Sequence, residues 1–357
     1  MKRALCLLVL VAACSHASPK AGPTTTPTPS TTPSATAAPS EDPTTAPTRT
    51  PTPTVGPAGT KVPRGFAPES ATFISDTTGW VLGSSPCPSG KGSCDVIART
   101  RDGGATWKAI PSPATSPDHL AQIRFADPTN GFVTGDQLWA THDGGATWRV
   151  VPGIGDVQGL AAAAGRVWID REGLLRSAPV SGGPFVTEQR DVAGFWLHGG
   201  TVAYSGDTGP QLHLTTHGGA DRTVTPPCAD GGRPVAGLGA GHWLVVCEQE
   251  AGLGHQEKHA FTTTDEGRTW KVAGDPPQAT GTDPYVTSDG DFVIDHQQVA
   301  VHRGSSWSVA LTTNGGLSEG GFESARLGYC IGGFGSAATQ TMKLTRDAGR
   351  SWHTVAF

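Results

Sequence analysis

Charged residues are scarce in this sequence: 16% of its 357 residues are Asp, Glu, Lys or Arg, against about 25% in an average soluble domain. The formal net charge is −5, so the chain offers no basic surface, and a nucleic-acid-binding protein is not expected. The apolar run Ala4 to Ala13 is ten residues long, about half of what a membrane-spanning helix needs.

The chain also lacks the motifs of several enzyme classes. It contains no P-loop, no glycine-rich dinucleotide fingerprint after a strand, no G-x-S-x-G turn and no EF-hand spacing. Nucleotide binding and α/β-hydrolase chemistry therefore have no motif to support them. A Ser/His/Asp arrangement assembled by the fold stays open at this point.

Glycine and proline are abundant, with 49 and 29 copies. Residues that break helices on this scale exclude a helical bundle or coiled coil, and they favour many short strands joined by turns. At about 150 residues per domain the length suggests two domains, but a single all-β unit is often longer than that.

The N-terminus has the pattern of an export signal. Met1-Lys2-Arg3 supplies positive charge, the apolar run follows, and the segment ends in Ala12-Ala13-Cys14. Small residues directly before a cysteine resemble the lipobox of bacterial lipoproteins. This resemblance implies a signal peptide over 1–13 and lipidation of Cys14, with two acyl chains anchoring the protein to the outer face of the cytoplasmic membrane. The alternative is an ordinary signal peptide with a chance cysteine.

The next segment, 14–63, is predicted to be a linker. Ser15 to Pro63 contains no Phe, Trp or Tyr and consists mostly of Thr, Pro, Ser and Ala. Such a composition cannot bury enough apolar area to fold, and its prolines favour an extended chain. We therefore predict a disordered stalk that acts as a spacer and carries a folded head over 64–357.

A short motif recurs in the head. Thr100–Trp107 reads T-R-D-G-G-A-T-W and Thr141–Trp148 reads T-H-D-G-G-A-T-W, with weaker copies at Thr263–Trp270 and Thr345–Trp352. Each resembles the Asp-box of the bacterial neuraminidase (BNR, sialidase-like) repeat. A second phrase, G-W-V-L-G at Gly79–Gly83, returns in variants at 131–135 and 328–332. Together the two phrases resemble the Asp-box propellers of the photosystem II assembly factors, the Ycf48/HCF136-like family.

The spacing of the motif predicts the number of blades. Successive tryptophans at 107 and 148, 270 and 307, and 307 and 352 lie 41, 37 and 45 residues apart, and the 122 residues from 148 to 270 leave room for two degenerate blades. Blades of about 40–50 residues are typical of propellers. We predict an all-β, seven-bladed propeller of four-stranded antiparallel blades.

The Asp-box residues are predicted to be structural and not catalytic. Glycine permits the tight turn, the aspartate accepts hydrogen bonds within it, and the tryptophan packs between blades. The residues assigned to these roles are Asp102, Gly104, Trp107, Asp143, Gly145, Trp148, Asp265, Gly267, Trp270, Asp347, Gly349 and Trp352.

Uneven loops point to a binding face. Strand alternation places the loops between second and third strands, and those between blades, opposite the Asp-boxes. Insertions are predicted there at Ser84–Cys94, Glu248–Lys258 and Phe334–Thr339, and loop elaboration on one face of a repeat protein favours binding on that face.

The cysteines fit an exported protein, because an oxidising compartment allows disulfides. We predict the pairs Cys87–Cys94 and Cys228–Cys247. Cys330 takes the place of a valine in the second repeated phrase, so it is predicted to be a buried, unpaired residue.

Catalytic and metal sites find little support. A sialidase needs three arginines on its substrate's carboxylate and a tyrosine nucleophile with a carboxylate partner, yet the chain has three tyrosines. Of these, only Asp283-Pro284-Tyr285 offers a candidate. His255, Glu257 and His259 are weak candidates for a metal site, since alternation along a strand would place them on one side; a solvated hairpin loop is preferred. We predict no cofactor and no enzyme activity.

These observations predict a non-catalytic, monomeric cell-surface lipoprotein. Its propeller is expected to bind a macromolecular partner, or to scaffold envelope protein assembly as the family resemblance implies, through the loop-rich face. The alternatives are a carbohydrate- or cell-wall-binding module and, third, a divergent sialidase-like glycoside hydrolase.

Overall fold

The computed structural model describes residues 59–113, 121–206, 209–228, 232–250, 256–313, 315–333 and 340–357, apart from the side chain of Glu250. The predicted signal peptide, Cys14 and nearly all of the predicted linker lie outside the described residues. No helix in the described ranges has the length and apolar character needed to cross a membrane.

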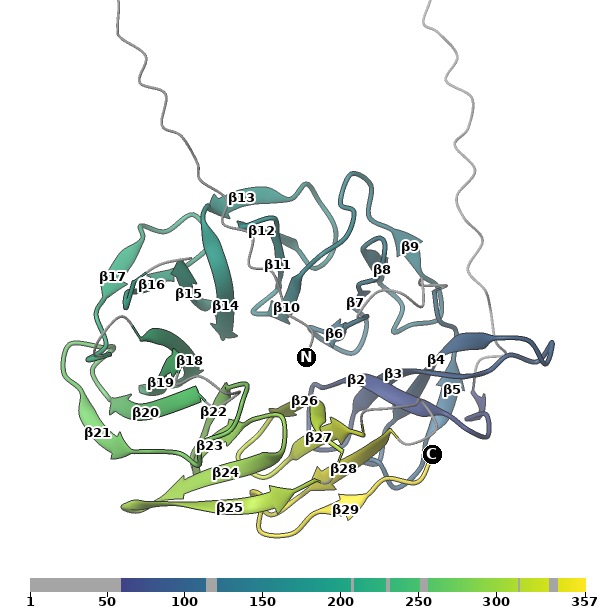
Figure 1. Cartoon of the computed structure of the whole chain (residues 1–357). Helices are drawn as coiled ribbons and strands as arrows, with labels where there is room; N and C mark the ends of the chain where they lie inside the picture. Colours follow the sequence, from purple (N-terminus) through teal and green to yellow (C-terminus); the bar gives the residue numbers. More distant parts are fainter. Residues whose placement is uncertain are drawn as a thin grey trace, which may run out of the picture. The chain divides into compact units, whose positions relative to one another are not determined.

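The described residues form seven antiparallel sheets, each built from strands that follow one another in the chain (Figure 1). In chain order the blades are β2 (Ala67–Phe73), β3 (Gly79–Pro86), β4 (Ser93–Thr100) and β5 (Lys108–Ile110), with β1 (Thr60–Lys61) beside β5; β6 (Ile123–Phe125), β7 (Gly131–Val133), β8 (Trp139–Thr141) and β9 (Arg149–Val150); β10 (Gly159–Ala163), β11 (Arg166–Arg171), β12 (Leu174–Pro179) and β13 (Val186–Gln189); β14 (Val192–His198), β15 (Thr201–Gly206), β16 (Leu212–Thr215) and β17 (Arg222–Val224); β18 (Arg233–Gly239), β19 (His242–Glu250), β20 (Gln256–Thr263) and β21 (Lys271–Gly274); β22 (Asp283–Thr287), β23 (Gly290–Ile294), β24 (Gln298–Arg303) and β25 (Ser306–Thr312); and β26 (Leu317–Phe322), β27 (Gly328–Gly332), β28 (Thr341–Thr345) and β29 (His353–Thr354).

The sheets form a closed ring. The first strand of each blade contacts the first strand of the next, and β26 of blade 7 contacts β2 of blade 1. These seven innermost strands surround the centre of the propeller (Figure 1). The predicted fold, an all-β propeller with seven blades, is confirmed.

Among the described strands none is exchanged where blade 7 meets blade 1, because each blade uses consecutive strands. The closure depends on side chains: Phe66 and Phe357 rings pack 4.7 Å apart, and the Tyr329 hydroxyl donates to the Ala71 carbonyl oxygen over 2.8 Å. The head includes β1, slightly before its predicted start at residue 64, since Thr60 and Lys61 pair with the outer strand β5.

Four turns between third and fourth strands share one hydrogen-bond pattern. In the first, Asp102 Oδ1 accepts the Thr106 N–H over 2.8 Å and Oδ2 accepts the Thr106 hydroxyl over 2.6 Å. These bonds lower the pKa of Asp102 to about 2. Gly104 has a φ of +94°, where a Cβ would be strained. Equivalent bonds are made by Asp143, Asp265 and Asp347.

The same turns touch the turns between first and second strands. Gly103 N donates to Thr77 O over 2.7 Å in blade 1, and Gly144 N donates to Thr129 O over 2.9 Å in blade 2. The two kinds of turn therefore lie on one face of the ring, which we call the Asp-box face; the opposite face carries the connections between second and third strands.

The tryptophans that follow these turns pack between blades. Trp148 is buried in one cluster with Trp80 and Phe125, and the Trp80 and Phe125 rings stack with their centroids 3.7 Å apart. The Trp148 Nε1 donates to Pro111 O over 3.0 Å. Trp107 is buried between blades 1 and 7. Trp270 and Trp352 are half-buried against their own inter-blade clusters.

The ends of two predicted inserted loops are strand. Ser84–Ser85 pair with Cys94–Asp95 at the ends of β3 and β4, and Glu248–Gln249 pair with Glu257–Lys258 in β19 and β20. The predicted loops were therefore too long at both ends, because hairpin pairing continues into them; in the first, Cys87–Gly92 connects the two strands. Phe334–Thr339 lies outside the described residues.

Candidate functional site

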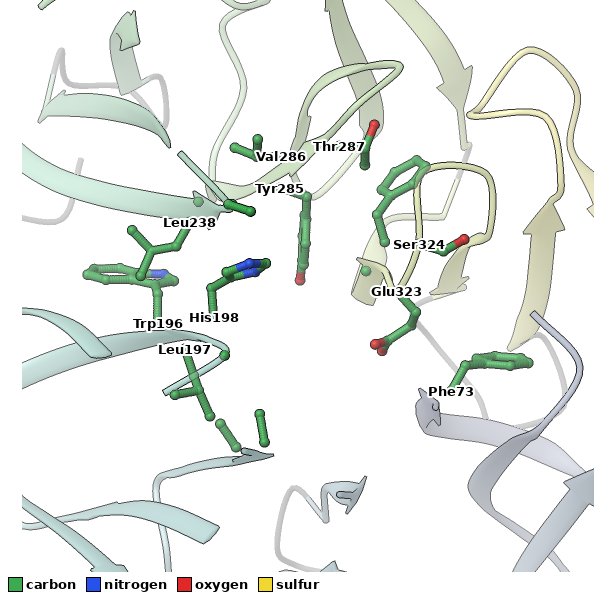
Figure 2. A pocket seen from close by; sticks show the side chains of 18 of the residues that line it. Phe73, Trp196, Leu197, His198, Leu238, Tyr285, Val286, Thr287, Glu323 and Ser324 are labelled. Atoms are coloured by element: carbon green, nitrogen blue, oxygen red, sulfur yellow. The ribbon is translucent and has the colours of Figure 1, made fainter. Parts of the chain in front are cut away.

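A cavity of 820 Å³ lies at the centre of the ring (Figure 2). Every innermost strand contributes its C-terminal half, together with the turn that follows it. Because those turns lie on the Asp-box face, the cavity opens there. The loop lengths had pointed to the opposite face, so this cavity is not where the sequence predicted binding.

One side of the cavity is apolar and belongs to blades 3 to 6. Ala161–Ala163 end β10 and Ala164 follows it, and Trp196, Leu238 and Val286 come from β14, β18 and β22. The His198 imidazole projects between Trp196 and Tyr285 (Figure 2). The short side chains of blade 3 leave the space that larger residues would fill.

The other side carries charge and belongs to blades 1, 2 and 7. Arg124 of β6 pairs with Glu319 of β26, with 3.3 Å between Nη1 and Oε1. Its guanidinium also donates to Ser70 Oγ and to the backbone oxygens of Ala71 and Ile123. Burial is the largest single influence on Arg124 and lowers its pKa, but the Glu319 carboxylate together with Tyr329, Tyr285 and Glu323 outweighs it, and the pKa is raised.

Glu319 connects the polar groups on this side of the cavity. Its Oε1 accepts hydrogen bonds from the Ala71 N–H over 3.0 Å and from the Tyr329 hydroxyl over 3.0 Å, in addition to the arginine. These donors come from blades 1, 7 and 2. The carboxylate therefore joins three blades at the ring closure.

Two tyrosines and two further carboxyl groups complete the surroundings. The Tyr285 hydroxyl donates to Gly320 O over 2.5 Å, and burial raises the pKa of both Tyr285 and Tyr329 well above the usual value. Burial, with Glu319 and Glu248 nearby, raises the pKa of Asp283 to about 6. Burial also raises the pKa of Glu323 to about 7, against the lowering influence of Arg124 and of a hydrogen bond from the Phe73 backbone.

This arrangement differs from that expected of a sialidase. Among the residues that line the cavity the arginine is Arg124, and Glu319 already occupies it, so a substrate carboxylate would find one engaged guanidinium where three are needed. Tyr329 stands beside a carboxylate as a nucleophile would, but it is 3% exposed and its hydroxyl also contacts Ala71 O. The Asp283-Pro284-Tyr285 candidate places its hydroxyl on a backbone carbonyl.

Comparison with known proteins identifies the fold. No protein-family model matches the sequence, and no curated protein does. Among solved structures, Ycf48 bound to a D1 peptide is similar with a TM-score of 0.56 and 14% identity, over 80% of this chain and 95% of the other. Ycf48 from Cyanidioschyzon merolae gives a TM-score of 0.55 and 12% identity, over 82% and 99%. The fold is that of a Ycf48-like β-propeller.

Enzymes share this fold as well. A catalytically inactive virginiamycin B lyase from Staphylococcus aureus, solved with quinupristin, has a TM-score of 0.54 and 9% identity, over 80% of this chain and 98% of the other. At such identities the likeness extends to the fold alone, and function has to be argued from the site.

Both predicted disulfides are present. Cys87 and Cys94 close the hairpin of β3 and β4 with Cα atoms 5.0 Å apart, and Cys228 and Cys247 link the segment before β18 to β19 with Cα atoms 5.3 Å apart. Cys330 is free and 1% exposed. Cys14 lies outside the described residues.

The weak metal candidates are only partly described. His255 lies outside the described residues, whereas Glu257 and His259 lie in β20, so a solvated loop was the wrong interpretation for them. His259 contacts Glu257 over 3.4 Å and Asp275 over 2.8 Å. Within the described part of the chain, no group of three His, Cys, Asp or Glu residues could hold a metal ion.

Sequence reasoning missed Arg124, Glu319 and Glu323. Arg124 interrupts an apolar strand as Ile123-Arg124-Phe125, and Ala161–Ala164 form an unusual run of small residues. These were the available signals. They could not be combined because the cavity takes its residues from all seven blades.

Proposed function

We propose that this protein is an exported, lipid-anchored and non-catalytic propeller whose central cavity binds a protein partner. The cavity of 820 Å³ carries the proposal, because ligand sites typically measure about 300–1,000 Å³ and combine apolar walls with a few polar groups. The fold likeness to Ycf48, one structure of which is bound to a D1 peptide, supports a polypeptide ligand by analogy.

A non-catalytic role is supported by how the polar groups are used. Arg124 and Tyr329 bind protein atoms on the wall or floor of the cavity, and Tyr285 bonds to Gly320 O. Groups engaged in this way position blades and are not free to attack or protonate a substrate.

Site-specific photocrosslinking in cells tests the proposal and separates the two faces. A photoreactive residue replaces Ser288, beside the cavity, or Lys91, at the tip of the β3–β4 hairpin on the opposite face; both are exposed. We expect a discrete protein adduct from position 288. Adducts from position 91 alone would indicate that the partner binds on the opposite, loop-rich face. The absence of an adduct from both positions would refute protein binding.

Lipid anchoring at Cys14 is a separate part of the proposal, supported by the sequence pattern Ala12-Ala13-Cys14. We expect the protein to partition with membranes and the Cys14→Ser variant to appear in the soluble exported fraction, because loss of both acyl chains removes stable anchoring. A variant that partitions like the parent would contradict lipidation.

The carbohydrate alternative has one specific observation in its favour. Trp196 and Tyr285 line the cavity, and aromatic rings provide large apolar faces with polar edges. A glycan and cell-wall-fragment array with the folded protein decides: saturable binding that Trp196→Ala removes would favour a glycan ligand over a protein.

A further inference from the structure

The cavity contains one carboxylate that forms no ion pair. Of its lining residues, Arg124 and Glu323 carry formal charge, and Arg124 is paired with Glu319. Glu323 has no ion-pair partner within 4 Å among the described residues; the Arg124 charge lowers its pKa from a greater distance, and its hydrogen-bond partner is the backbone N–H of Phe73. The cavity therefore presents a carboxylate with no direct countercharge.

The position of Glu323 is fixed. It follows β26 in the turn to β27, and the next residue, Ser324, donates its hydroxyl to Asp76 Oδ1 in blade 1 over 2.7 Å. The Glu323 side chain projects from this turn toward the space faced by Tyr285 and His198 (Figure 2). A group held by neighbouring bonds loses little freedom on binding a ligand.

The surroundings suit a cation on an apolar stem. Trp196, Leu238 and Val286 line the cavity from blades 4 to 6, where they also pack against the inter-blade clusters, so a ligand can bury methylene groups against their accessible parts while its charge reaches Glu323. A volume of 820 Å³ exceeds what a lone amine fills, which favours a polypeptide segment over a free amine.

We propose that the cavity binds a lysine or arginine side chain of the partner polypeptide, with its cationic head on Glu323 and its stem against the apolar wall. The inference rests on the proposed protein-binding function and names the chemistry of its ligand. It accounts for a carboxylate of the cavity that forms no ion pair within 4 Å among the described residues.

Proton linkage gives a readout that a merely structural role would not change. The pKa of Glu323 is raised to about 7, so a bound cation lowers it and releases a proton near neutral pH. Affinity should therefore rise with pH between about 5 and 8. The other titratable groups beside this site are His198 and His242 on the side of blades 4 and 5, Tyr285, Tyr329 and the Arg124–Glu319 pair. The pKa of His242 is raised by its hydrogen bond with Asp291, and a protonated His242 would repel a cation and act in the same direction. The Glu323 carboxylate therefore has to be removed to isolate its share.

The probe is an acetylated pentapeptide amide with one central lysine or arginine among alanines, measured by calorimetry in two buffers of different ionisation enthalpy. The uncharged comparison peptide has norleucine at the centre, and n-butylamine represents a free amine. Glu323→Gln is the test variant. Glu257→Gln, an exposed carboxylate of β20, is the control with the same change in net charge.

We expect the lysine or arginine peptide to bind about tenfold more tightly than the norleucine peptide, or by about 1.4 kcal/mol, since a charge-assisted hydrogen bond adds to the apolar contact that both peptides make. Glu323→Gln should remove this preference and the proton release, and Glu257→Gln should keep both. Equal binding of the charged and uncharged peptides, no saturation at millimolar peptide, or an unchanged Glu323→Gln variant overturns the inference. Binding of n-butylamine as tight as the peptide assigns the site to a small amine instead.

The two proposals fail differently. If photocrosslinks form at position 288 but charge has no effect on peptide binding, the protein-binding function stands and the basic ligand is wrong. If no crosslink forms and the peptides do not bind, the proposed function itself is wrong. Circular dichroism of each variant excludes loss of the fold as the cause.

Discussion

Removal of the Glu319 carboxylate should destabilise the ring at its closure. One oxygen of Glu319 accepts from the Ala71 N–H, the Arg124 guanidinium and the Tyr329 hydroxyl, at 3.0, 3.3 and 3.0 Å. The Glu319→Ala substitution leaves all three donors without this acceptor and leaves the Arg124 cation without its countercharge. Loss of one partner of a buried ion pair costs about 3–5 kcal/mol.

The lower end of that range applies because the Arg124 side chain is 26% exposed and water can solvate part of it. We therefore expect a loss of about 3 kcal/mol in the free energy of unfolding. For a domain of this size this corresponds to a fall of roughly 6 °C in the melting temperature. Glu319→Gln keeps an acceptor oxygen and should lose less.

A double-mutant cycle with Arg124→Ala, measured by urea unfolding, isolates the pair. Removal of both charges should cost clearly less than the two single losses added together, with a coupling of about 0.5–3 kcal/mol. The control is Arg222→Ala, which breaks the exposed Arg222–Glu266 pair at the same 3.3 Å distance and should cost less than about 1 kcal/mol. Additive single effects, or a Glu319→Ala loss no larger than the control's, would refute the reasoning.

Three further predictions concern the blades. Trp148→Ala should lower the free energy of unfolding by about 3–5 kcal/mol because the indole ring is buried between blades 1 and 2. Trp148→Phe should lose less, and an unchanged unfolding midpoint for the alanine variant would contradict the packing of Trp148 between these blades. The Cys228–Cys247 bond has a sequence separation of 19, against 7 for Cys87–Cys94. Its removal should cost about 3 kcal/mol of stability, slightly more than removal of the Cys87–Cys94 bond, because it closes the longer loop. Thermal unfolding of the two double Cys→Ser variants tests this, and the reverse order of stability would contradict it. Stability should fall as pH drops from about 4 toward 2. The reason is that Asp102, Asp265 and Asp347 have pKa values lowered to about 2 in the folded protein and bind protons more readily when unfolded. The melting temperature of Asp347→Asn should depend less on pH across this range than that of the parent, and an equal slope would disprove the role given to Asp347.

The blades were predictable because their signal is local. An Asp-box fits within eight residues, and its turn needs a glycine at positive φ and an aspartate at a fixed offset, as at Gly104 and Asp102. Its recurrence in the sequence then counts the blades. The same reasoning found the disulfides, since Cys87 and Cys94 bracket one hairpin.

The cavity was not predictable because its signal is distributed. Glu319 meets Arg124 across 195 positions and Ala71 across 248, so their contact depends on the closed ring and not on any motif. Loop length was a poor guide for a different reason: the extra residues at Ser84–Cys94 and Glu248–Lys258 extend existing hairpins. Such extensions add strand without enclosing space.

The Asp-box turns and the cavity share a face, and this has a consequence for binding. In blades 1 and 2 the box turn is hydrogen-bonded to the turn that rims the cavity, and in blade 7 Ala348 N donates to Arg326 O over 3.1 Å. These are the blades that supply Arg124, Glu319 and Glu323. Charged groups bind with specificity when their supports are rigid, so the repeated turns hold the charged side of the cavity in place. Blades 3 and 4 have no such aspartate in the turn. They supply Ala161–Ala164 and Trp196 on the apolar side, where binding depends more on contact area than on the orientation of the side chains. The decay of the motif in those blades is therefore compatible with a binding site on the Asp-box face.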